Sequence, residues 1–387
     1  MKTAKQAFTA AAVVSALAAA DPAAAQQTMD LGNPSAEATE PFSSVAGLRE
    51  MSDGSLLVAD GLEGSLLRVS SDLGSATPIG RNGAGPREYR TPDALYAMAA
   101  DTTLMVDLGN GRLSVLAPDG SIVRSVPIAG GDGPRMTIMM PGGVDAAGRV
   151  FFRQMPGPSS GGPPDSTTVA RFDPASGETA QLARVKLPDM AVQSRGAANN
   201  REEVTRPVPL SAQDAWTVTG DGRLVVARSA DQAYWLEIDG AGEPARGPRI
   251  PYEPVVVRGP DRQAWIASLA GALGVSVEME NGRQRTTFSR GGAPALDPDD
   301  LEWPEVKPAF PGNALRTAPD GNYWLERHVL AGEPHTFDVL DEAGRRVGTV
   351  RLPADRRLEG FGSRSVYASR VDELDFVWLE RYELPAF

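Results

Sequence analysis

The sequence contains no cysteine and only two histidines among its 387 residues. The missing cysteine excludes disulfides, thiol catalysis, zinc sites built on cysteine, and a lipid anchor on an N-terminal cysteine. The two histidines, His328 and His335, flank a predicted turn through residues 332–334. A catalytic triad that uses histidine, or a metal centre rich in histidine, therefore lacks the necessary side chains.

Long hydrophobic runs are also missing, apart from one at the N-terminus. Two lysines precede an apolar segment at residues 7–20, and three alanines stand just before Gln26. This order is typical of a cleaved export signal. We therefore predict a signal peptide at residues 1–25, a single domain at residues 26–387, and a periplasmic or secreted mature protein. No later run reaches about 18 apolar residues, so no membrane span is expected after cleavage.

Basic residues are too few to balance the acidic ones, and the formal net charge is −12. An acidic protein repels the phosphates of nucleic acid over the distance at which salt screens charge. No nucleic-acid partner is therefore expected, and the charge is explained by solubility alone.

What the sequence does contain is one short phrase that returns six times, a tight turn followed by an apolar strand. The copies begin at Asp53, Asp101, Ala147, Asp221, Asp320 and Gly362. Further strand-like segments follow the copies, separated by clusters of Asp, Gly and Pro that are typical of hairpin turns. A spacing of roughly 45 residues indicates a β-propeller. We predict an all-β, six-bladed β-propeller, and an open β-sandwich is the alternative.

The strand before each copy is expected to line the central channel of the propeller. These innermost strands are predicted at residues 44–51, 94–99, 143–145, 215–218, 314–317 and 358–361. The sixth blade lacks an outermost strand where the chain ends. We predict that residues 27–31 supply it, because such closure pairs the two ends of the chain and removes a free edge.

The linker between the first two blades resembles one in a known family. Residues 80–92 read Gly-Arg-Asn-Gly-Ala-Gly-Pro-Arg-Glu-Tyr-Arg-Thr-Pro. They resemble the Gly-x-Gly-Pro-Gly-Glu-Phe-x-x-Pro linker of secreted bacterial six-bladed β-propellers in the NHL-repeat and TolB-like superfamily, although Arg87 replaces the usual glycine and Tyr89 the usual phenylalanine. Residues 303–310 resemble the same family. The resemblance implies a fold and a compartment, and it implies no reaction.

One insertion interrupts the repeat between blades four and five. It spans residues 252–311, and an apolar pattern at residues 261–273 predicts a short helix within it. Insertions on one face of a propeller commonly form contacts with partners. We therefore predict a partner contact through Arg258, Arg262, Trp265 and Trp303. A helix that only packs over the blade edge is the alternative.

The central channel is the expected place for a small ligand. Four polar residues near the ends of its strands are the candidate ligand-binding residues, namely Arg49, Arg90, Asp93 and Arg316. Arginine side chains there can bind a carboxylate or a phosphate through two parallel hydrogen bonds. The alternative is that these side chains form ion pairs between blades.

A calcium site is a further alternative. Calcium-dependent lactonase propellers gather Glu, Asn and Asp at one mouth of the channel, and oxygen ligands of this kind suit a hard cation. The candidates near the innermost strands are Glu50, Asp93, Asp145, Asp214 and Asn313. They occupy unlike positions in their blades.

Because the repeat is intact and no catalytic set stands out, the sequence favours an exported, non-enzymatic binding or scaffold propeller without a cofactor. Its partner is expected to be an envelope or extracellular protein, or a small ligand, of unidentified kind. The alternative is a metal-dependent propeller enzyme, either a hydrolase of the lactonase kind or a lyase, that uses carboxylates at the channel mouth.

Overall fold

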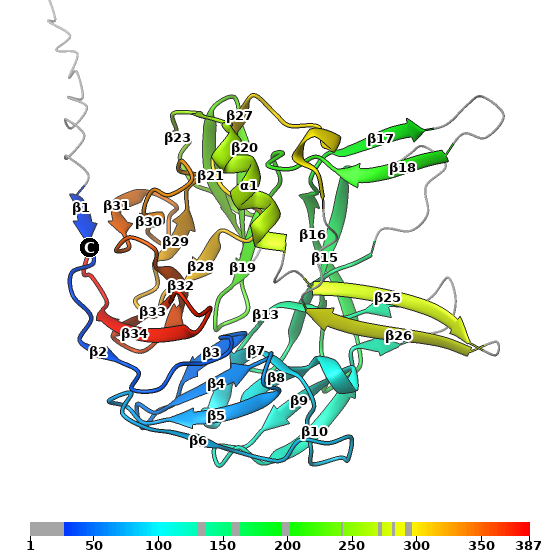
Figure 1. Cartoon of the computed structure of the whole chain (residues 1–387), viewed down its shortest axis with the longest axis vertical. Coiled ribbons are helices and arrows are strands. Elements are labelled where there is room, and N and C mark those ends of the chain that lie inside the picture. The colour runs from blue at the N-terminus through cyan, green and yellow to red at the C-terminus, as the bar shows by residue number, and fades with distance from the viewer. Residues whose placement is uncertain are drawn as a thin grey trace, which may run out of the picture.

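The computed structural model describes residues 27–130, 137–155, 163–195, 202–240, 243–269, 273–280, 283–290 and 296–387. Six antiparallel sheets surround a central axis, each with its first strand innermost, so the predicted six-bladed β-propeller is confirmed (Figure 1). The predicted signal peptide lies outside these residues. Within them, no helix is both long and apolar enough to cross a membrane.

Each blade is an antiparallel sheet whose strands follow one another from the axis outward. Blade one contains β3 (Gly47–Glu50), β4 (Leu56–Asp60), β5 (Ser65–Val69) and β6 (Ala76–Pro78). Blade two contains β7 (Pro92–Ala97), β8 (Thr103–Asp107), β9 (Arg112–Leu116) and β10 (Ile122–Pro127). Blade three contains β13 (Pro141–Val144), β14 (Val150–Arg153), β15 (Ser166–Phe172) and β16 (Thr179–Lys186).

The second half of the ring repeats this pattern with additions at its edges. Blade four contains β19 (Ala215–Val218), β20 (Leu224–Ala230), β21 (Ala233–Ile238) and β22 (Ala245–Arg246), and β23 (Ile250–Pro251) also pairs with β21. Blade five contains β28 (Leu315–Thr317), β29 (Tyr323–Glu326), β30 (Thr336–Leu340) and β31 (Arg346–Arg351). Blade six contains β32 (Arg357–Phe361), β33 (Ser365–Val371) and β34 (Val377–Glu383). Every predicted innermost strand overlaps the observed one.

The repeated phrase forms the turn between the first and second strands of a blade. In blade one, the Asp53 carboxylate accepts a hydrogen bond from the backbone N–H of Ser55 at 2.9 Å, and Gly54 has φ of +81°. This left-handed conformation favours glycine. All five residues of β4 that follow are buried. Turn chemistry and burial together therefore dictate the phrase.

Closure of the ring differs from the prediction. We expected residues 27–31 to complete blade six. Instead β1 (Gln27–Asp30) runs parallel to β31 at the outer edge of blade five, and β2 (Ala36–Glu37) pairs with β34 in blade six. The reason is that the outer edge of blade five is also open, and Arg351 holds Asp30 there through two hydrogen bonds of 2.6 and 3.0 Å. The C-terminal end of the chain lies beside β1 (Figure 1).

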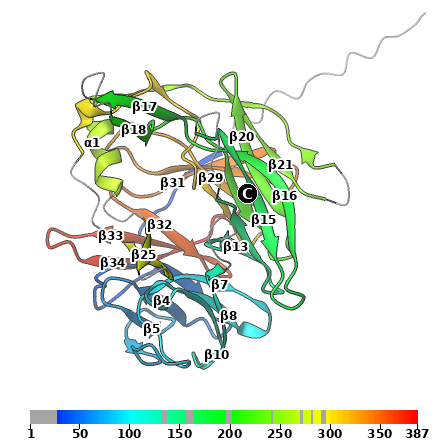
Figure 2. The ribbon, with the colours of Figure 1, turned by 90° about the vertical axis from the view of Figure 1, so that its right-hand side faces the viewer.

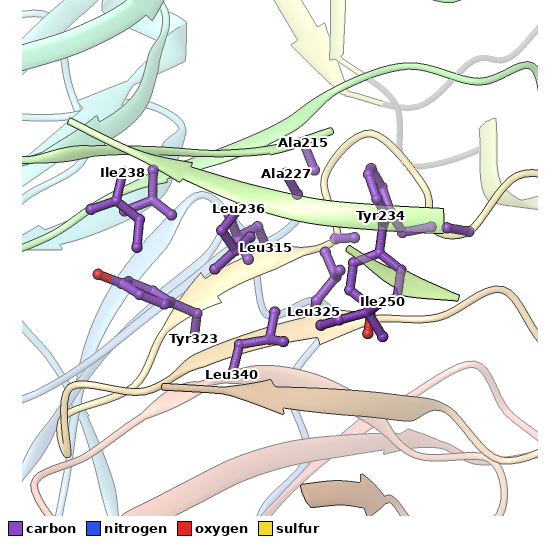
Figure 3. Packing of buried hydrophobic residues seen from close by; sticks show 14 residues of the cluster. Ala215, Ala227, Tyr234, Leu236, Ile238, Ile250, Leu315, Tyr323, Leu325 and Leu340 are labelled. Atoms are coloured by element: carbon purple, nitrogen blue, oxygen red, sulfur yellow. The ribbon is translucent and has the colours of Figure 1, made fainter. Parts of the chain in front are cut away.

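Apolar clusters between neighbouring blades form the core. The cluster between blades four and five contains Leu236 and Tyr234 from one blade, and Leu315, Tyr323 and Leu340 from the other, all at most 2% exposed (Figure 3). Burial of about 25 cal/mol for each Å² of apolar surface drives this packing. Each blade is therefore stabilised mainly by the two blades beside it.

The linker at residues 80–92 folds as a compact loop around Tyr89, which is 4% exposed. The Tyr89 hydroxyl donates to the carbonyl of Ile79 at 2.7 Å and accepts from the N–H of Leu66 at 3.1 Å. Tyr89 thus links Ile79, which follows the outermost strand of blade one, to Leu66 inside the same blade. Its role is structural.

The insertion crosses one face of the ring. Its base is a short pair of β24 (Val255–Val256) with β27 (Val306–Lys307), and its helix α1 spans Gly259–Ser268, so the predicted helix is confirmed with an earlier start. A hairpin follows, made of β25 (Leu273–Glu280) and β26 (Arg283–Arg290). Phe288 of this hairpin packs on Leu108 and its neighbours in blade two. The insertion therefore reaches from blades four and five to the opposite side of the ring (Figures 1 and 2).

A buried ion pair fixes the insertion to blade five. Lys307 Nζ donates to Asp261 Oδ1 at 2.7 Å and to the carbonyl of Val329 at 2.5 Å, and both charged side chains are at most 7% exposed. The carboxylate also accepts from the backbone N–H groups of Ala331 and Arg258, each at 2.8 Å. Burial alone would raise the pKa of Asp261, but these hydrogen bonds hold it below its usual value.

Replacement of Lys307 by Met is expected to destabilise the protein by about 3–5 kcal/mol, because it leaves the Asp261 carboxylate buried without its counter-charge. Denaturant unfolding measures the change. The matched control is Arg345→Met, which breaks the largely exposed pair with Asp341 and is expected to change stability by about 1 kcal/mol or less. Equal effects of the two substitutions would contradict a docking role for the buried pair.

Candidate functional site in the central channel

The channel has two chemically different ends. We call the end formed by the turns between first and second strands the turn end, and the opposite end, where the chain enters each innermost strand, the insertion end. At the turn end the channel widens into a cavity of about 810 Å³. Apolar residues of the innermost strands line its inner part, namely Leu48, Leu95, Val144, Val218 and Phe361.

A charged cluster lies in the insertion half of the channel. It contains Arg316 from β28, Arg357 and Glu359 from β32, and Tyr96 from β7, whose side chains act on one another electrostatically. Arg316 turns back toward the insertion end, where it donates to the carbonyl of Asn313 at 2.6 Å. Blades two, five and six therefore contribute side chains to one place.

Glu359 is the titratable group of this cluster. The register of β32 shifts between Leu358 and Gly360, so Glu359 occupies a β-bulge, a feature that re-aims a side chain and is frequent beside active sites. Burial raises the pKa of Glu359, against the opposing effects of the Ser369 hydroxyl and of the two arginines. Ser369 Oγ donates to the carboxylate at 2.5 Å. The carboxyl group is thus held in place and shifted toward its protonated form.

The two arginines of the cluster keep free donors. Within the ranges that the structure describes, neither Arg316 nor Arg357 forms an ion pair, although Glu326 and Glu359 act on Arg316 through space. Burial lowers the pKa of Arg316, yet its side chain retains exposed surface inside the channel. A guanidinium group in this situation can bind an anion that enters from solvent.

The four predicted channel residues do not form one site. Arg49 is 7% exposed and donates to Asp101 Oδ1 at 2.8 Å in the next blade, which confirms the alternative of an ion pair between blades for this residue. Arg90 is exposed on the linker, and Asp93 is buried at the start of β7. Only Arg316 belongs to the charged cluster.

Arg357 and Glu359 were not predicted from the sequence. Their spacing of two residues on a strand places both side chains on one face unless a bulge intervenes, and the innermost position of the strand was predicted. Because a bulge does intervene here, the Arg-x-Glu spacing could not have placed the two side chains together. The bulge itself, which decides where Glu359 lies, leaves no mark in a single sequence.

The candidate calcium ligands are separated and already bonded. Glu50 accepts from the backbone and side chain of Ser363 at 2.8 and 2.9 Å, and from the Tyr367 hydroxyl at 2.7 Å. Asp214 accepts from the N–H of Lys186 and pairs with Arg228. In the described part of the chain, no three His, Asp or Glu side chains come together as metal ligands.

The four predicted residues of the insertion lie close to one another. The rings of Trp265 and Trp303 meet edge to face at 5.6 Å, and Arg262 lies over Trp303. Trp303 also donates to the carbonyl of Pro298 at 2.7 Å, while Arg258 precedes the helix. Three of these side chains thus form a half-buried cluster within the insertion, and the partner contact stays a prediction.

The two histidines have unlike surroundings. His335 Nδ1 lies 2.5 Å from Glu326 Oε1 near the surface. Burial, followed by the nearby Lys307 ammonium, lowers the pKa of His328 to about 4, against the opposing carboxylates of Glu326 and Asp261. His328 is therefore neutral beside the ion pair that fixes the insertion.

Acidification below pH 6.5 is expected to destabilise the protein in part through His328. The unfolded chain protonates this side chain near 6.5 and the folded chain only near 4, so stability present above 6.5 is lost as the pH falls. Replacement of His328 by Asn should flatten the dependence of unfolding free energy on pH in this range. His335→Asn is the matched control, and equal slopes in the two variants would contradict the assignment.

Comparison with known proteins adds only the fold. The sequence matches no protein-family model and no curated protein. The structure is similar to a gluconolactonase from Xanthomonas campestris, with 10% identity, a TM-score of 0.41, and coverage of 89% of this chain and 87% of that chain. It is similar to virginiamycin B lyase from Staphylococcus aureus, with 10% identity, a TM-score of 0.38, and coverage of 90% and 98%.

A third similar structure is regucalcin, a calcium-binding protein from Agrobacterium tumefaciens, with 10% identity, a TM-score of 0.40, and coverage of 93% and 97%. Likeness at this level agrees with the propeller fold and carries no argument about chemistry.

The prediction of a non-enzymatic scaffold is wrong. The solved structures similar to this chain include a gluconolactonase and a lyase. The prediction also depended on the absence of a catalytic set, and it did not consider Glu359, a carboxyl group with a raised pKa that interacts electrostatically with Arg316 and Arg357. That prediction is therefore not kept.

Proposed function

We propose that this protein is a hydrolase or lyase that acts on a small anionic molecule in the insertion half of its channel. The observation that carries the proposal is Glu359, a carboxyl group with a raised pKa that lies on a β-bulge beside Arg316 and Arg357. A carboxyl group whose pKa is shifted toward neutrality is suited to exchange protons with a substrate.

The arginines would bind the anionic group of the substrate. Their donors are not used in ion pairs within the described ranges. In a chain of net charge −12 they form a local region of positive potential, which attracts anions against the overall charge of the protein. A carboxylate or phosphate held by Arg316 and Arg357 would bring the atoms next to it within reach of Glu359.

Glu359 would then transfer the proton. In its ionised form the carboxylate takes a proton from an attacking water or from a carbon beside the bound anion, and in its protonated form it gives the proton to the leaving oxygen. The Ser369 hydroxyl, which donates at 2.5 Å, orients the group for both steps. Both steps would use the side chains of Glu359 and Ser369.

The proposal includes the compartment and the wider family. The order of charged, apolar and small residues before Gln26 supports export to the periplasm or beyond. The linker at residues 80–92 supports a place among the NHL-repeat and TolB-like propellers. An envelope or extracellular protein that binds Arg258, Arg262, Trp265 and Trp303 would be a second partner beside the small substrate.

The test is a panel of lactones and esters that carry a carboxylate, with turnover measured by proton release. We expect turnover of at least one member. Replacement of Glu359 by Gln should lower kcat by at least about a hundredfold with little change in KM, because the arginines still bind the anion. The control is Glu383→Gln, which alters an exposed carboxylate at the end of β34.

Folding is checked in the same variants. The folded-state pKa of Glu359 is raised, so the stability that its protonated form contributes is lost as the pH rises above the usual value for glutamate. Glu359→Gln should therefore be at least as stable as the wild type at neutral pH. Absence of turnover across the panel, or equal activity of the Glu359→Gln and Glu383→Gln variants, would contradict the proposal.

A further inference from the structure

The cavity at the turn end is separate from the charged cluster and has its own chemistry. Its lining includes the turns of blades one, four, five and six together with the apolar inner residues named above. Its volume of about 810 Å³ lies in the range of small-molecule sites. Neither Glu359 nor Arg316 is among its lining residues.

Two buried polar atoms in this lining have no hydrogen-bond partner among the described residues, the hydroxyl of Tyr323 and Nε of Arg49. Tyr323 is 0% exposed and Arg49 is 7% exposed. The Tyr323 hydroxyl lies at the margin of the apolar cluster, away from Leu325 and Ile250 (Figure 3). Buried donors without acceptors are destabilising unless a ligand or water supplies oxygen atoms.

A matched tyrosine shows the contrast. Tyr234 belongs to the same apolar cluster, and its hydroxyl donates to the buried Asp338 carboxylate. The fold thus provides an acceptor for the hydroxyl of Tyr234 but, among the described residues, none for that of Tyr323, which belongs to the cavity lining. Burial also raises the pKa of Tyr323, so its hydroxyl stays protonated and can donate.

The charges of the lining disfavour an anion. The lining contains only two arginines, Arg49 and Arg223. It contains four carboxylates, those of Glu50, Asp101, Asp221 and Glu342. Carboxylates at the rim accept hydrogen bonds from hydroxyl groups, and the buried donors need acceptor oxygens. The apolar inner wall, with Phe361 held edge to face on Trp324 at 5.0 Å, suits a C–H surface.

We infer that the turn-end cavity is a second binding site, which takes a neutral polyhydroxylated ligand of the size of a small sugar. Each hydroxyl of such a ligand both donates and accepts, which matches a lining of buried donors and rim carboxylates. The cavity and its two unpartnered atoms carry this inference independently of the enzyme proposed above.

The experiment is calorimetric titration of the purified chain with maltose, cellobiose and diacetylchitobiose as neutral probes, and with gluconate as an anionic probe. At least one neutral probe should bind in the millimolar range or tighter, and gluconate should not displace it. Tyr323→Phe should weaken this binding about tenfold, because one hydrogen bond to the ligand is lost. Glu359→Gln, at the other site, should leave it unchanged.

Stability separates a ligand role from a structural one. Tyr323→Phe removes a hydroxyl that the protein does not satisfy, so the thermal midpoint without ligand should stay the same or rise. Tyr234→Phe should lower the midpoint, because it removes one of the two hydroxyl donors of the buried Asp338 carboxylate and leaves only that of Thr349. Glu342→Gln, at the exposed rim, is a second binding variant that does not affect the core, and it should also weaken the neutral probe.

Three results would overturn the inference. These are no binding by any neutral probe, equal binding by the wild type and Tyr323→Phe, and stronger binding by gluconate than by the neutral probes. Loss of lactone turnover in Glu359→Gln with sugar binding intact would support the separation of the two sites.

Discussion

The apolar contact between neighbouring blades is the interaction on which the rest of the structure depends. A blade is a thin sheet with two faces to bury, and only the blades on either side can cover them. The cluster shared by Leu236 of blade four and Leu340 of blade five shows the arrangement. Because each blade needs two neighbours, the ring is stable only when it is complete, and polar side chains near the axis must fit between the blades or face the channel.

This constraint divides the polar residues of the innermost strands into two groups. Arg49 and Arg316 occupy equivalent positions, since they stand opposite Leu57 and Trp324, which are the same residue of the repeated phrase. Arg49 finds the carboxylate of Asp101 in the next blade. Arg316 is instead influenced electrostatically by Arg357 in the next blade, and it forms no ion pair among the described residues. The same place in the repeat thus forms an ion pair in one blade and, in our proposal, binds an anion in another.

The repeat made the fold predictable, because the glycines of the turns and the apolar residues of the second strands form a pattern that is visible over a few neighbouring residues. The innermost strands and the helix of the insertion followed from the same local patterns. The site was predicted only at Arg316. Arg90 and Asp93 lie outside the charged cluster, and the sequence could not show this, because neighbours in the sequence do not reveal which side chains meet across the axis. Glu359 was missed because a bulge, and the burial that shifts its pKa, depend on contacts between blades. Closure of the ring was the least predictable part of the fold. The sequence shows that blade six lacks an outer strand, but it does not show that the outer edge of blade five is also open.

The use of both edges, with β1 on one blade and β2 on the next, has a consequence for the order of assembly. Residues 27–37 lie early in the sequence, yet every strand they pair with lies beyond residue 345. The leading segment must therefore wait, unpaired, until almost the whole chain has been made. Blades one to four can pack before that moment, whereas blades five and six acquire their outer strands together at the end. Pairing of β1 and β2 with strands from the far end of the sequence is therefore expected to be a late step of folding.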